Sequence, residues 1–173
     1  MDATTLALEH LDIWWLSYRQ RVDGLTDAEH LWSPVDGFTV REVDGRWMID
    51  DIPDRGADPA PFTSIAWRMW HIAVDCLDSY SRRGFGSQSG PDDMEWVGTA
   101  AEALGRTDAA WGHFRGELGA LDAEGWNRPL GDQFGPYADR PYLALALHAH
   151  AEVTHHAAEV GLLRDLYRET VAR

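Results

Sequence analysis

Residues 141–171 read PYLALALHAHAEVTHHAAEVGLLRDLYRETV, and their apolar side chains recur every three or four positions, as in an amphipathic helix. Pro141 suits the start of such a helix, because the N–H that proline lacks has no helical partner there in any case. Gly161 is the one residue inside the stretch that weakens a helix. The stretch therefore predicts one long helix near the end of the chain.

Three earlier stretches predict further helices, and one predicts a hairpin. Residues 4–22, 63–83 and 99–121 each carry an apolar face, and the last of them opens on a Thr-x-x-Glu capping box. Residues 38–50 are different, because two short alternating segments flank an Asp-Gly pair, which is typical of a tight β-hairpin turn.

These elements show no regular alternation of strand and helix, so the sequence predicts an all-α fold. We expect an up-down four-helix bundle with a short β-hairpin and a long loop between the first and second main helices. The length of 173 residues fits one domain over residues 1–173.

The charge balance excludes several kinds of partner. The chain has 15 basic and 29 acidic residues, so its formal net charge is 15 − 29 = −14. Such a surface repels phosphate backbones and anionic lipids, and we expect neither nucleic acid nor a membrane as a partner. A single cysteine excludes an intramolecular disulfide, and residues 1–16 lack the basic start of a signal peptide. We expect a cytoplasmic protein.

The last helix carries the strongest chemical signal. On a helical wheel, Glu152 and His156 lie one turn apart on the face that also holds Leu145 and Leu163. A carboxylate buried between leucines is costly unless it is paired or binds a metal, and a Glu and a His at this spacing can bind one ion. The paired residues therefore predict part of a site for Zn²⁺ or a similar first-row ion.

A third ligand has to come from another helix, and His71 is the best candidate. It lies in the middle of the second predicted helix beside the apolar residues Trp67 and Trp70. Asp75 and Asp78 follow closely and are candidates to orient its ring.

Ordinary structural roles compete with each of these predictions. A lone histidine on a half-apolar face is usually hydrogen-bonded, and a Glu–His pair in an acidic protein is usually solvated. Cys76 is expected to be a small core residue. Arg68 and Arg164 are candidate anion contacts, but helical arginines in an acidic protein are usually surface ion pairs. From the residues alone, a bundle without a metal stays open.

Four segments, taken in order, resemble the DinB/YfiT-like superfamily, including its mycothiol-dependent maleylpyruvate isomerase branch. They are GLTDAE at 24–29, TSIAWRMWHIA at 63–73, AEVTHHAAEV at 151–160 and LLR at 162–164. The resemblance implies a four-helix bundle, a homodimer and a metal held by His71, Glu152 and His156. Most members have histidine where this chain has Glu152, so His148 or His155 stays open as a replacement ligand.

The resemblance also implies a chemistry. Three protein ligands leave a coordination position open, which is the catalytic pattern. The expected cofactor is Zn²⁺, Ni²⁺ or another divalent ion, with mycothiol as cosubstrate, and the expected reaction is S-transfer to, or isomerisation of, a small electrophile. Two alternatives are a non-catalytic, stress-associated metal-binding protein and a metal-dependent hydrolase. We expect the loops at 84–93 and 122–139 to form the mouth of the site, and the tryptophans to line it or to pack in the core.

Overall fold

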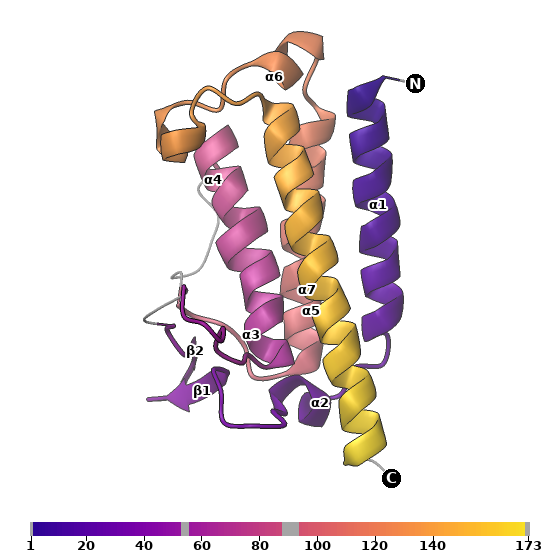
Figure 1. The fold of residues 1–173 in the computed structure, drawn as a ribbon, viewed down its shortest axis with the longest axis vertical. Helices are drawn as coiled ribbons and strands as arrows, with labels where there is room; N and C mark the ends of the chain where they lie inside the picture. Colours follow the sequence, from indigo (N-terminus) through magenta and orange to yellow (C-terminus); the bar gives the residue numbers. More distant parts are fainter. Residues whose placement is uncertain (1, 53–55, 88–93, 172–173) are drawn as a thin grey trace.

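Figure 1 shows a computed structural model of the chain, which describes residues 2–52, 56–87 and 94–171. Four long helical segments lie side by side: α1 (Ala3–Val22), a continuous run of α3, η1 and α4, then α5 (Ala100–Gly119) and α7 (Tyr142–Thr170). Shorter helices connect them: α2 (Asp27–Leu31), α6 (Ala123–Asn127) and the 3₁₀ helix η2 (Asp132–Tyr137). Within the described residues, each helix is too short or too polar to cross a lipid bilayer.

The predicted hairpin is confirmed. Strands β1 (Val40–Val43) and β2 (Arg46–Ile49) pair antiparallel, with Val40 opposite Ile49. Between them Asp44 and Gly45 have φ angles of 52° and 77°, the left-handed pair that a two-residue turn of this kind requires. The Asp-Gly pair was therefore a reliable signal, since glycine adopts such angles without steric cost.

The directions of the helices differ from the predicted up-down alternation. Helix α5 runs parallel to the α3–η1–α4 run, and Tyr80 and Phe114, which lie towards the ends of these two segments, contact each other with ring centroids 5.9 Å apart. The chain returns to the hairpin before α5 begins, because the N–H of Trp96 donates to the carbonyl of Trp47 at 2.8 Å. The prediction of strict alternation is therefore wrong for the third helix.

The core is one connected cluster with residues from all four long segments. Trp15 of α1 and Trp111 of α5 stack with ring centroids 4.6 Å apart and planes 7° apart. Most of the tryptophans are buried in this cluster: Trp15, Trp67, Trp70, Trp96, Trp111 and Trp126. Core packing is therefore the role of these rings.

The second main helix contains a π-helical segment that periodicity did not predict. Helix α3 (Ile65–Trp70) continues as η1 (His71–Asp78) and then as α4 (Ser79–Phe85). In a π-helix each residue bonds the fifth along the chain, which brings side chains five apart onto nearly the same face. The segment begins at His71, so the widened turn lies at the candidate metal site.

Arg164 is not a surface residue, contrary to the expectation for a helical arginine. It is 2% exposed, and its Nε donates to Oε1 of Glu29 at 3.0 Å. Glu29 also accepts from the backbone N–H of Thr26, and the two residues form a capping box at the start of α2. This buried pair joins α2 to α7.

Acidification is expected to destabilise the fold through His30. This side chain is fully buried, and burial lowers its pKa from 6.5 to about 4. A histidine with a depressed pKa contributes stability above its unfolded pKa and loses it as pH falls from 6.5 towards 4. We expect a loss of about 2–3 kcal/mol over that window.

Denaturant unfolding at a series of pH values measures this loss. The matched variant His30→Gln carries no titrating ring, so its unfolding free energy should change much less between pH 6.5 and 5, above the range where unfolded carboxylates titrate. Equal slopes for the two proteins would contradict the role of His30.

Candidate metal centre

The structure brings the three predicted ligands together. His71 lies at the start of η1, while Glu152 and His156 lie one turn apart on α7. Oε2 of Glu152 lies 3.4 Å from Nε2 of His71 and 3.2 Å from Nε2 of His156. One donor atom from each residue lies within 4.8 Å of the others, which is compatible with binding a single ion.

Each histidine ring is held from its other side by a carboxylate. Oδ2 of Asp75 lies 2.9 Å from Nδ1 of His71, and Oε2 of Glu159 lies 2.6 Å from Nδ1 of His156. Metal-binding histidines commonly have such a partner, which fixes the ring and makes the free nitrogen a better donor. The donor set and its supporting carboxylates therefore fit a divalent metal ion.

Of the two aspartates predicted to orient His71, only Asp75 contacts it among the contacts described. Asp78 lies instead within electrostatic reach of Arg82 and of the α5 residues Arg106 and His113. The physical reason is the winding of the helix, since Asp75 is four residues from His71 and Asp78 is seven residues away on a widened turn.

Arg68 supports the second histidine, which the sequence did not indicate. Its Nη1 contacts Nδ1 of His156 at 3.2 Å and forms an ion pair with the carboxylate of Glu159. The side chain is only 15% exposed, so the expectation of a surface ion pair was wrong here too. Arg68 orients Glu159, and Glu159 orients the ring of His156.

The carboxylates around the centre stabilise positive charge on its histidines. Burial acts to lower the pKa of His71, but its contacts with Asp75, Cys76 and Glu152 outweigh burial and raise that pKa to about 11. In return, His156 and His71 hold the pKa of Glu152 well below its usual value. Protons and a metal ion therefore compete for the same nitrogen atoms.

The two alternative histidines lie outside this group. Nδ1 of His148 is 3.7 Å from Oε1 of Glu152, on the side that faces the cavity. His155 is 67% exposed in its side chain and pairs with Glu159 at 3.2 Å. His155, His156 and Glu159 also have donor atoms within 4.8 Å of one another, so that set stays open as a second, more exposed grouping.

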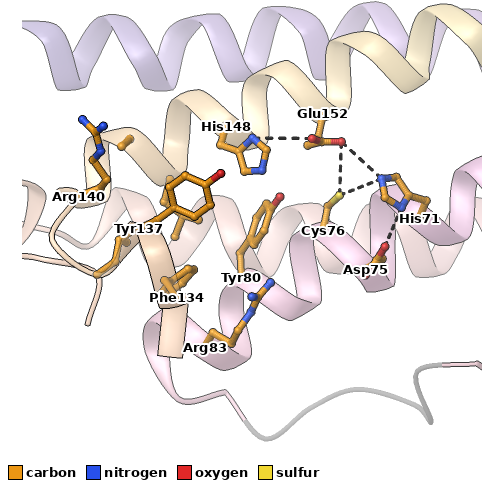
Figure 2. A pocket seen from close by; sticks show the side chains of 13 residues that line it. His71, Asp75, Cys76, Tyr80, Arg83, Phe134, Tyr137, Arg140, His148 and Glu152 are labelled. Carbon is orange, nitrogen blue, oxygen red and sulfur yellow. Dashed lines mark hydrogen bonds and ion pairs between the residues drawn. The ribbon is translucent and has the colours of Figure 1, made fainter. Parts of the chain in front are cut away.

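Cys76 lies at the centre, although the sequence predicted only a core residue. Its Sγ is 3.5 Å from Nε2 of His71 and 3.9 Å from Oε2 of Glu152, and Figure 2 shows it between these two groups. The residue is 3% exposed, so the prediction of burial is confirmed. The proximity to His71 follows from the π-helical turn, which a regular helical wheel does not represent.

A cavity of about 580 Å³ opens beside His71, Cys76 and Glu152. Its lining continues past Tyr80 and His148 to Arg140 on the side away from His71, and Arg83 lies beside Tyr80 (Figure 2). The rest of the lining consists of Asp75, Leu130, Phe134, Tyr137, Ala144 and Leu145.

The cavity lining tests the predicted mouth and the predicted role of the tryptophans. The predicted loop at 122–139 contributes to it, whereas residues 88–93 of the loop at 84–93 lie outside the described part of the chain. Among the described residues, none of the tryptophans is part of the lining.

The chain matches a known protein family over most of its length. Residues 10–160 match the DinB superfamily, and the chain belongs to that superfamily. The comparison with curated proteins and the comparison with solved structures found no match.

Proposed function

We propose that this chain binds one divalent metal ion, Zn²⁺ or another first-row ion such as Ni²⁺, through His71, Glu152 and His156. One observation carries the proposal: both Nε2 atoms turn towards one carboxylate oxygen of Glu152, while both Nδ1 atoms face other carboxylates. Three protein ligands suit a site that also accepts a small molecule. In this proposal the four long segments form the four-helix bundle of the superfamily, with the ligands projecting inward from two of them.

We further propose that the site serves a thiol-dependent S-transferase or isomerase, as in the mycothiol-dependent branch of the superfamily. A bound divalent ion acts as a Lewis acid that lowers the pKa of a thiol, so that the nucleophilic form exists near neutral pH. The supporting observation is the cavity, which begins at the ligands and has room for a small thiol and a small electrophile.

The side chains along the cavity suggest how substrates are held. Arg140 lies at the end of the cavity away from His71 and Arg83 lies beside Tyr80, and either guanidinium group would bind a carboxylate of the thiol or of the electrophile. His148 lies between that end and Glu152, in position to carry a proton to or from the reacting atoms. The homodimer stays a prediction that a mass measurement in solution tests.

The experiment that tests this function follows loss of thiol in the presence of a chlorodinitrobenzene. The Zn²⁺-loaded protein is supplied with mycothiol, with glutathione and cysteine as comparison thiols. We expect thiol consumption that needs the metal and falls to the uncatalysed rate in Glu152→Ala. His155→Ala is the matched control, because its exposed ring lies outside the proposed ligand set and should leave the rate nearly unchanged.

Two other outcomes would replace this function. Metal binding without consumption of any thiol or electrophile in a wider panel would favour the non-catalytic metal-binding alternative. Metal-dependent hydrolysis of an ester or amide without added thiol would favour the hydrolase, in which bound water is the nucleophile.

A further inference from the structure

We infer that Cys76 is a fourth protein ligand of the metal, so that the resting site is closed and the sulfur of Cys76 holds the position that an incoming thiol takes. This inference rests on the proposed function, because it requires the metal site formed by His71, Glu152 and His156. The inference concerns Cys76, which lies beside the three ligands and is not itself part of the triad.

The distances between donor atoms carry the first step. Zn²⁺ binds nitrogen at about 2.0–2.1 Å and sulfur at about 2.3 Å, so a tetrahedral shell separates N from S by about 3.5 Å and N from O by about 3.3 Å. Sγ of Cys76 lies 3.5 Å from Nε2 of His71. The same sulfur lies 3.9 Å from Oε2 of Glu152, a few tenths of an ångström beyond the tetrahedral spacing. The group of donor atoms within 4.8 Å of one another holds His71, Glu152 and His156 without Cys76, so the sulfur has to shift towards His156 when the ion binds.

The orientation of the donors is the second step. The sulfur faces Nε2 of His71, the nitrogen that also faces Glu152, and not Nδ1, which Asp75 holds. Figure 2 shows the sulfur, the carboxylate of Glu152 and the ring of His71 around one point.

The backbone supplies the third step. His71 and Cys76 are five residues apart, and they both lie in η1, whose π-helical turn brings residues five apart onto nearly one face. In a regular α-helix the same two side chains would diverge by well over 90°. Asp75 and Cys76 can therefore contact the two nitrogens of the same ring, and π-helical turns frequently lie at functional sites.

A sulfur ligand has two consequences for the site. It favours Zn²⁺ and other thiophilic ions over hard ions such as Mg²⁺. It also makes entry of the substrate thiol an exchange: Cys76 leaves the ion and takes up the proton that the incoming thiol gives up, so the exchange neither consumes nor releases protons.

Cobalt substitution tests this role with a readout independent of activity. Co²⁺ is added to metal-free protein in thiol-free buffer, and both the bound metal and the absorption spectrum are measured. Cys76 is the single cysteine of the chain, so a thiolate-to-cobalt charge-transfer band in the near ultraviolet identifies it. We expect the band in the wild type and its complete loss in Cys76→Ser, which should still bind about one equivalent of Co²⁺.

The outcomes separate this inference from the proposed metal site. Co²⁺ bound at one equivalent without a charge-transfer band would overturn the role of Cys76 and leave the triad intact. No uptake of Co²⁺ by the wild type would overturn both. If Cys76→Ser does not fold, X-ray absorption of the Zn²⁺-loaded wild type decides the matter: one sulfur neighbour at about 2.3 Å supports the inference, and a shell of nitrogen and oxygen alone overturns it.

Discussion

Replacing Arg164 by methionine is expected to lower the free energy of unfolding by about 3–4 kcal/mol, a large part of the stability of a single domain. Both side chains of the pair are almost fully buried. The substitution therefore leaves the carboxylate of Glu29 buried with one charged partner fewer. Arg168, whose Nε lies 2.9 Å from the same carboxylate oxygen, keeps part of the compensation, so we expect the lower end of the range for a broken buried pair.

Denaturant unfolding of wild type and Arg164→Met at pH 7 measures this effect. Arg168→Met is the matched control, because its side chain is 50% exposed and the substitution should cost less than about 1 kcal/mol. The double variant Glu29→Leu with Arg164→Met should lose less than the two single variants together, since no charge is then left alone. Additive losses would contradict the pairing.

Amphipathic periodicity predicted the helices and hairpin because these features are local. The Asp-Gly turn, the side-chain cap at Thr99 and the helical faces each depend on residues within a few positions, and the structure has them close to where they were expected. The spacing of Glu152 and His156 is also a local feature, because two residues four apart on a helix lie on one face wherever the helix packs.

Features that depend on contacts between segments far apart in the sequence were not predicted. The direction of α5 is set by residues 94–96 pairing with β2, a contact between segments about fifty residues apart that has no periodic signature. Arg164 meets Glu29 across an even longer separation, so its burial could not be deduced from the composition of its own helix.

The sequence missed the role of Cys76 because of the π-helical winding of η1. A wheel drawn at 100° per residue separates Cys76 from His71, whereas the observed segment places their side chains in contact. Arg68 was missed for a different reason, because its partner Glu159 lies on another helix and the pair forms only when α3 and α7 pack together.

Substituting a single ligand of the metal centre is expected to remove most of its affinity for Zn²⁺. Structural zinc sites bind with about 10–16 kcal/mol shared among four ligands, so His71→Ala, Glu152→Ala or His156→Ala should each cost about 3–4 kcal/mol, roughly 10²–10³-fold in affinity. Asp75→Asn leaves the ligands in place and removes only the support of the His71 ring, and should cost about 10–100-fold.

Elemental analysis of untagged protein and competition with a chelator at pH 7.5 measure these affinities. The sign of the pH dependence follows from the raised pKa of both histidines: each proton must leave before the ion binds, so affinity should fall as pH is lowered and binding should release protons to the buffer. Full retention of metal in Glu152→Ala, with loss in His155→Ala, would move the site to the exposed grouping of His155, His156 and Glu159. Because Glu152 contacts both histidines of the triad, its variant separates the two groupings sharply.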